Sequence, residues 1–190
     1  MPIVGQFGSL AGLGSLILPG GVMESIQTVT LSNSTTSSVT FSDVGGYQHL
    51  QIRGLIRNTR AASADGSTMT MRFNSDTGSN YFSHRLRGDG VASANAYTTR
   101  SSLYMVDYAS DSATASVFTA FVIDILDYGS TSKNKTVRSL QGADFNGSGY
   151  VNIMSGAWNS TSAVTSITLL DATYNFKQYS TFALFGLRAP

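Results

Sequence analysis

The acidic residues are the first candidates for chemistry, because two carboxyl groups that face each other across a cleft can hydrolyse a glycosidic bond. The 190-residue chain has eleven acidic residues, of which Glu24 is the only glutamate. Asp124 and Asp127 are close in sequence, but their side chains point to opposite faces of the strand predicted for this region. The spacing therefore predicts no catalytic pair of carboxylates.

Four further aspartates lie in glycine-rich segments that favour turns: Asp76, Asp89, Asp111 and Asp144. In such turns the Asp side chain accepts hydrogen bonds from the backbone a few residues further on. Oxygen-rich loops can also bind Ca²⁺, but none of these segments has the ligand spacing of an EF-hand. We therefore expect structural turns, with no metal site and no cofactor.

The two histidines, His49 and His84, are candidates for a general base. A hydrolytic site also needs a nucleophile and an orienting group, and serine is too abundant here for its presence near a histidine to carry information. The chain has no Gly-x-Ser-x-Gly motif and no cysteine, so it lacks a nucleophile elbow, disulfides and thiolate metal sites. We expect both histidines to make structural hydrogen bonds, and we predict no catalytic residue.

Two other features would suit binding. Seven aromatic residues could line a sugar-binding face, although packing within the sheets is the commoner role of such residues: Tyr81, Phe82, Tyr97, Tyr104, Tyr108, Tyr150 and Trp158. The tripeptide Arg87-Gly88-Asp89 matches an integrin-recognition motif, but Arg-Gly-Asp-Gly after a strand is also ordinary turn chemistry. We expect the turn.

The charge of the chain is low and evenly spread. Charged residues make up 12% of the sequence and the formal net charge is +1, without a basic block that would attract nucleic acid. The apolar segment 10–18 is too short to span a bilayer, and no signal peptide is recognisable. Because low net charge favours association, the composition is typical of a protein that works within an assembly, without nucleic-acid or membrane partners.

The longest nearly unbroken apolar run is Ala115–Tyr128, and its β-branched and aromatic residues favour a strand. Apolar side chains fall on both alternating faces, so we expect the middle strand of a sheet, covered on both sides. Asp124 interrupts this run. Either it forms a buried ion pair with Arg53, in the middle of another strong strand, or this part of the face is exposed to solvent.

Strand patterns and turn clusters alternate through the rest of the chain, and no convincing helix is present. The count is about ten strands, and in addition to the central run the strand patterns cover 25–31, 39–44, 49–57, 68–73, 81–87, 101–108, 136–140, 150–158, 164–170 and 179–187. Their number and spacing favour an all-β fold, an antiparallel β-sandwich of jelly-roll-like topology.

Residues 1–23 differ from this domain, which we expect to occupy residues 24–190. They are rich in glycine and apolar residues and carry no charged side chain. A disordered leader is one interpretation. The other, which we favour because disordered tails are usually polar, is an extended assembly arm that packs against a neighbouring subunit. Its contacts would come from eight side chains: Ile3, Val4, Phe7, Leu10, Leu13, Leu16, Ile17 and Leu18.

Four segments together resemble small virion proteins of tailed bacteriophages. These are His49–Arg57, then Phe73–Tyr81 with the following His84–Gly90, then Phe121–Tyr128, and finally Tyr179–Leu187. The resemblance covers most of the chain from about Glu24 onward. It implies a jelly-roll structural protein without catalytic residues.

The resemblance also implies a location in the virion and a role for the chain. The first expectation is a capsid decoration (cement) protein that clamps neighbouring capsomers. The alternative is a tail-fibre or receptor-binding module that recognises a host surface glycan. The expected partners are the major capsid protein or another virion protein, together with further copies of the chain, with a trimer favoured over a dimer.

Overall fold

The computed structural model describes residues 23–62 and 65–188, and all regular secondary structure in these ranges is β-strand. Twelve strands follow one another: β1 (Met23–Thr30), β2 (Ser38–Ser42), β3 (His49–Ile56), β4 (Asp65–Phe73), β5 (Tyr81–Gly88), β6 (Ala92–Arg100), β7 (Leu103–Ala109), β8 (Thr119–Leu126), β9 (Lys135–Asp144), β10 (Gly149–Trp158), β11 (Ser166–Leu170) and β12 (Thr181–Leu187). All pairings between these strands are antiparallel.

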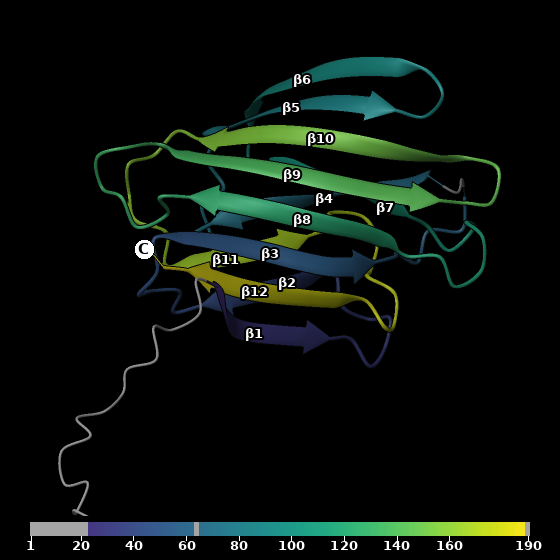
Figure 1. Ribbon diagram of the computed structural model, residues 1–190, viewed down its shortest axis with the longest axis horizontal. Coiled ribbons are helices and arrows are strands. Elements are labelled where there is room, and N and C mark those ends of the chain that lie inside the picture. Colours follow the sequence, from purple (N-terminus) through teal and green to yellow (C-terminus); the bar gives the residue numbers. More distant parts are fainter. Residues whose placement is uncertain (1–22, 63–64, 189–190) are drawn as a thin grey trace, which may run out of the picture.

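The strands form two sheets that pack face to face (Figure 1). The large sheet has the order β1-β12-β3-β8-β9-β10-β5-β6, and the small sheet has the order β2-β11-β4-β7. Figure 1 looks onto the large sheet, with the small sheet behind it. The all-β antiparallel sandwich predicted from the sequence is confirmed.

Eight strands make up two matching four-stranded halves, β1-β12-β3-β8 and β2-β11-β4-β7. In each half, strands from the N-terminal part of the chain alternate with strands from its C-terminal part: β12 lies between β1 and β3, and β11 lies between β2 and β4. This alternation is a jelly-roll-like order. The remaining strands are two hairpins, β5–β6 and β9–β10, which extend the large sheet past β8. They carry it beyond the small sheet, at the top of Figure 1.

The core lies between the inner faces of the two sheets. Ile52, Phe121, Ile123 and Phe182 of the large sheet are buried in one continuous apolar cluster with side chains of the small sheet such as Phe41. Strand alternation explains the selection, because every second residue of a strand faces the opposite sheet.

Strand β8 is the fourth of eight strands in the large sheet, and among the described residues only its inner face is covered. Phe121, Ile123 and Ile125 point inward and are buried, whereas Ala120 and Leu126 on the other face are exposed. Within residues 23–62 and 65–188 no second layer lies over the outer face, so the covering layer predicted for both sides of this strand is not found among the described residues. The outer face of β8 carries apolar side chains there.

The free edge of β7, the last strand of the small sheet, is closed by side chains of the large sheet. Ser83 Oγ accepts a hydrogen bond from the Tyr104 backbone N–H at 3.1 Å, and Thr119 Oγ1 accepts one from the Ala109 N–H at 2.9 Å. The Tyr150 hydroxyl donates to the Asp107 carbonyl at 3.0 Å. Unpaired strand edges promote aggregation, and here polar residues on an otherwise apolar inner face satisfy the edge.

Strands β1 and β12 bring the two ends of the described domain together. Met23 pairs with Leu187 across the antiparallel ladder, so the chain enters and leaves the sandwich at the same corner. The eight side chains of the predicted assembly arm, between Ile3 and Leu18, lie outside the described residues. Met23, placed at the end of that arm from the sequence, is the first residue of β1.

Candidate functional site

The outer face of the large sheet carries a group of exposed apolar side chains, called the outer apolar patch below. Its members come from five adjacent strands, β3, β8, β9, β10 and β5: Leu55, Leu86, Leu126, Leu140, Val151 and Ile153. Five of them are 48–58% exposed: Leu55, Leu86, Leu140, Val151 and Ile153. Contiguous apolar surface of this kind marks interaction sites in soluble proteins.

Register explains why these side chains form one patch. Val122, Leu140, Ile153 and Leu86 face one another in sequence across β8, β9, β10 and β5. Directly opposite residues of an antiparallel pair have Cβ atoms about 5 Å apart, so their side chains touch. The alignment of four strands therefore produces one continuous apolar row that no single strand reveals.

A shallow hollow of about 440 Å³ lies within the outer apolar patch. Its floor is low because Ala120 and Gly142, which pair across β8 and β9, have little or no side chain. Val122, Leu140 and Val151 form its walls. The patch thus combines a hollow with the protruding side chains of Ile153 and Leu86 beside it.

Polar groups occupy the next row of the outer face, which separates Leu126 from the other members of the patch. Asp124 Oδ2 accepts a hydrogen bond from Arg138 Nε at 2.9 Å, and its Oδ1 accepts one from Gln51 Nε2 at 2.6 Å. Arg53 is exposed and donates from Nε to Gln51 Oε1 at 2.5 Å. The predicted buried pair of Arg53 and Asp124 is thus corrected: the partner of Asp124 is Arg138, on the adjacent strand, and the carboxylate lies on the outer face.

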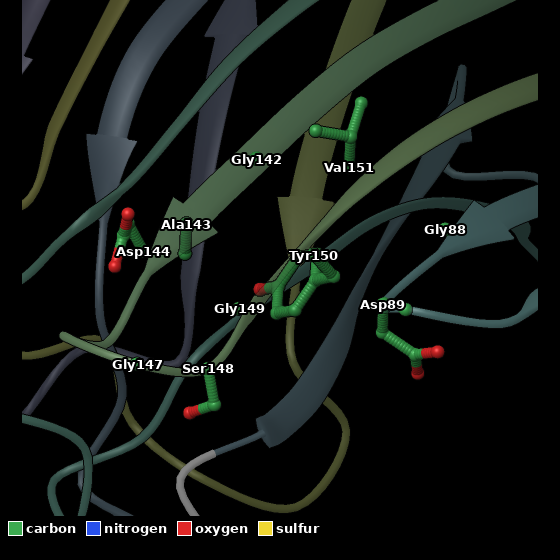
Figure 2. Close-up of a pocket in the computed structure, with 11 residues that line it drawn as sticks. Gly88, Asp89, Gly142, Ala143, Asp144, Gly147, Ser148, Gly149, Tyr150 and Val151 are labelled. Carbon is green, nitrogen blue, oxygen red and sulfur yellow. The ribbon is translucent and has the colours of Figure 1, made fainter.

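A second candidate is an open hollow of about 670 Å³ at the end of the large sheet, formed by the β5–β6 and β9–β10 turns (Figure 2). Tyr150 lies between Asp144 and Asp89 in this view. Asp144 Oδ1 accepts a hydrogen bond from the Asn146 N–H at 2.8 Å, so that carboxylate caps its own turn. The hollow is otherwise lined mainly by glycine and small residues, with few groups that could fix a ligand.

Asp89 belongs to the Arg87-Gly88-Asp89 tripeptide at this hollow. Arg87 Nε donates to Asp89 Oδ2 at 2.9 Å, and this hydrogen bond holds the pKa of Asp89 below its usual value. The general acid of a glycosidase needs a raised pKa. The Arg87 guanidinium also lies 4.6 Å from the centre of the Tyr150 ring. The two charged groups of the tripeptide thus bind each other within a turn.

Asp76 and Asp111 complete the four turn aspartates. The Asp76 carboxylate accepts hydrogen bonds from the Gly78 N–H at 2.7 Å, the Trp158 indole N–H at 2.7 Å and the Asn80 amide at 3.0 Å. The side-chain hydrogen bonds from Asn80 and Trp158 lower the pKa of Asp76. The predicted self-capping is present at Asp76, Asp89 and Asp144. Asp111 differs, because its carboxylate lies beside two cations.

The loop that contains Asp111 is organised by Arg57, which follows β3 and is 5% exposed. Its guanidinium donates to four backbone carbonyls of this loop, those of Asp111, Ala113, Thr114 and Val117, at 3.1, 2.9, 2.8 and 2.9 Å. Lys177 Nζ adds a 2.7 Å ion pair with Asp111 Oδ2. A single buried arginine thus fixes the shape of a seven-residue segment.

Beside this loop lies a third hollow, of about 310 Å³. Tyr179 on its rim is 67% exposed and has a backbone φ of 72°, and Ser116 on the same rim has a φ of 61°. Non-glycine residues rarely adopt positive φ, and such strain concentrates at functional sites. Phe118, Asp111 and Gln178 also line the hollow.

The residues singled out from the sequence occupy different places. Four of the seven aromatics considered for a sugar-binding face are buried: Tyr81, Tyr108, Tyr150 and Trp158. Phe82, Tyr97 and Tyr104 are half-buried. His49 Nδ1 accepts the Asp127 backbone N–H at 3.0 Å, a structural role, whereas His84 is exposed on the outer face of β5. The exposed aromatic of the 310 Å³ hollow, Tyr179, was missed, because it stands just before the alternating pattern of β12 and was counted as the first residue of that strand.

Within the described ranges no three His, Asp or Glu side chains gather in a way that could hold a metal ion. The same part of the chain contains no helix of the length and hydrophobicity needed to cross a membrane. Neither a protein-family model nor a curated protein matches this sequence. The outer apolar patch is therefore the candidate site with the most structural support.

Proposed function

We propose that this chain is a non-enzymatic structural protein of a tailed-phage virion, a capsid decoration (cement) protein that stabilises the head by clamping neighbouring capsomers. The observation that carries the proposal is the outer apolar patch, which lies on a face of an eight-stranded sheet that no other described part of the chain covers. A domain with a formal net charge of only +1 gains little solubility from charge repulsion. Both features favour a subunit of a larger assembly.

The segments that resemble phage virion proteins support the same interpretation. Three of them contribute β3, β8 and β12, which are adjacent strands of the large sheet. The resemblance thus falls on the strands that form the sandwich core and part of its outer face. Under the proposal, attachment to the capsid uses residues 1–22, which are apolar and uncharged in sequence.

Quantitative mass spectrometry of purified phage particles tests the proposal. A decoration protein covers the capsid surface, so we expect hundreds of copies per particle. A count of tens or fewer, or absence from the particle, would contradict it.

Deletion of residues 2–20 tests the attachment site separately. We expect the truncated chain to keep its β-domain, because the described sandwich begins at Met23, and to bind particles lacking the protein more weakly. The intact chain serves as control. Undiminished occupancy and affinity after the deletion would assign attachment to another surface.

A glycan-binding module of a tail fibre is the second candidate, and the hollow beside Tyr179 is the observation that favours it. An exposed aromatic ring can stack on the apolar face of a sugar, while the neighbouring carboxylate and amide groups accept and donate hydrogen bonds. A glycan array compares the wild type, Tyr179→Ala and Tyr97→Ala. Binding that is lost only in Tyr179→Ala would support this candidate, and absence of binding by the wild type would remove it.

A further inference from the structure

We infer that the outer apolar patch is a self-association surface on which a second copy of this chain docks through a twofold axis. The inference concerns the purified chain and does not depend on its location in a virion. Three properties of the patch favour a second copy as the occupant: its extent, its shape and its charge.

The extent of the outer face matches what a stable dimer needs. Eight strands about 4.8 Å apart, with about seven residues each rising about 3.3 Å, give a face of roughly 38 Å by 23 Å, or roughly 900 Å². A standard interface buries about 800 Å² on each partner. The five central strands that carry the patch would form the apolar core of such an interface, and the flanking strands would form its polar rim.

The shape of the patch is complementary to itself. A twofold interface brings the same surface of both copies together, so each protrusion must find a recess within the same patch. The hollow above Ala120 and Gly142 is that recess, and the adjacent Ile153 and Leu86, each 54% exposed, are the protrusions. A twofold axis beside the hollow places the protruding side chains of each copy over the small residues of the other. Sheets stacked in this way lie about 10 Å apart.

The charges on this face do not oppose such pairing. Arg138 is neutralised by Asp124 within the same chain. Arg53 keeps its charge, but it lies on β3 beside Val122, at one end of the apolar row, and bonds to Gln51 there. The remaining ionisable group on this face of β5 is His84. The polar row is thus largely satisfied before association, and it can lie at the rim while the apolar rows meet.

A twofold dimer differs from the trimer that the family resemblance favours. A flat sheet face can be fully covered by one identical face, whereas a threefold ring uses two different surfaces of each subunit. The other occupants to consider are residues 1–22 of the same chain and an unrelated protein. In both cases the purified full-length chain remains a monomer, so the mass in solution separates these occupants from a second copy.

Analytical ultracentrifugation of the full chain at micromolar concentrations provides the test. We expect twice the chain mass of 20.1 kDa for the wild type. Ile153→Asp and Leu140→Asp introduce a charge on exposed patch positions and should weaken dimerisation at least about 100-fold, leaving monomers. Thr40→Asp, on an exposed position of small-sheet strand β2, is the matched control and should remain dimeric. Circular dichroism of each variant verifies that the sheets are retained.

Because the chain has no native cysteine, spin labels at single introduced cysteines locate the interface independently of stability. Labels at Ser155→Cys, on the exposed outer face of β10, should lie within about 20 Å of each other in a dimer whose sheets stack about 10 Å apart. Labels at Thr40→Cys should be separated by at least about 30 Å, because each label lies on the small sheet of its copy and the two large sheets lie between them, which gives three spacings of about 10 Å. A wild-type monomer, a trimer, a dimer that survives both patch substitutions, or a reversed order of the two label distances would overturn the inference.

Discussion

Arg57 provides the sharpest test of how the loops of this sandwich are held, through the substitution Arg57→Met. Methionine retains much of the apolar stem but removes every donor to the 111–117 loop. Of the four hydrogen bonds, the one to the Ala113 carbonyl is buried and the other three are partly buried. A buried acceptor without a partner costs about 1–3 kcal/mol.

Water can reach the three partly buried carbonyls, so each of these bonds contributes less than the buried one. Hydrogen bonds to charged groups contribute about 1.5–3 kcal/mol each when fully effective. Adding the contribution of the buried hydrogen bond to the smaller contributions of the three partly buried ones gives an expected loss of about 3–5 kcal/mol in the free energy of unfolding. Arg57→Lys should lose about half as much, because a point-like ammonium cannot reach four carbonyls at once.

Urea unfolding at a fixed protein concentration measures this loss, and amide hydrogen exchange localises it. The Ala113 and Val117 amides donate to Ser110 and Thr114 within the loop, and they should exchange faster in Arg57→Met while the core strands keep their relative protection. Arg53→Met is the control, since this exposed arginine lies shortly before Arg57, on β3, and makes one side-chain hydrogen bond, and we expect a loss below about 1 kcal/mol. A loss below about 1 kcal/mol in Arg57→Met itself would refute the assignment of the loop to this arginine.

Three further predictions concern the core, the outer face and alkaline stability. Phe121→Ala empties a buried site beside Phe182 and should lower the free energy of unfolding by about 3–5 kcal/mol in denaturant titrations; a change below about 1 kcal/mol would place the ring outside the core. A double-mutant cycle on Asp124 and Arg138 should give a coupling below about 1 kcal/mol that shrinks with salt, because the arginine side chain is 68% exposed; a salt-independent coupling of several kcal/mol would show that the pair is shielded from solvent. Burial raises the pKa of Tyr81 to about 12, so the unfolded chain loses the Tyr81 proton at a lower pH than the folded chain does. The free energy of unfolding therefore falls as the pH rises from 10 to 12, and this group contributes at most about 2.7 kcal/mol to the fall. Tyr81→Phe should reduce that slope in unfolding measured across the same pH range, and an unchanged slope would contradict the shift.

Much of the fold could be predicted because alternation in a strand is a local property. Val39 and Phe41 in β2, or Leu50 and Ile52 in β3, alternate with polar residues, and the buried positions follow directly. Strand β6 was missed, since its small and polar residues lie exposed on both faces of an edge hairpin and leave no apolar period. Only the register with β5 identifies it as a strand.

The outer apolar patch could be seen only in part from the sequence. Apolar residues on both faces of β8 were recognised, but the second covering layer inferred from them is not found in the part of the chain that the structure describes. The partner of Asp124 depends on which strand follows β8 in the sheet. Arg53 in β3 pairs directly with Val122, whereas Arg138 in β9 pairs directly with Asp124. Strand order is a property of the whole fold, and no local pattern encodes it.

The pairing of Met23 with Leu187 makes the sandwich suited to circular permutation. The end of β12 and the start of β1 are adjacent antiparallel strands, so a turn of about two to four residues could join them as a hairpin. New termini opened between Asn146 and Gly147, an exposed turn, would then emerge at the far end of the β9–β10 hairpin. A permutant that folds with the thermal stability of the parent would show that the order of strands in space, and not their order along the chain, specifies this domain. A fused peptide could then be displayed at either end of the sheet.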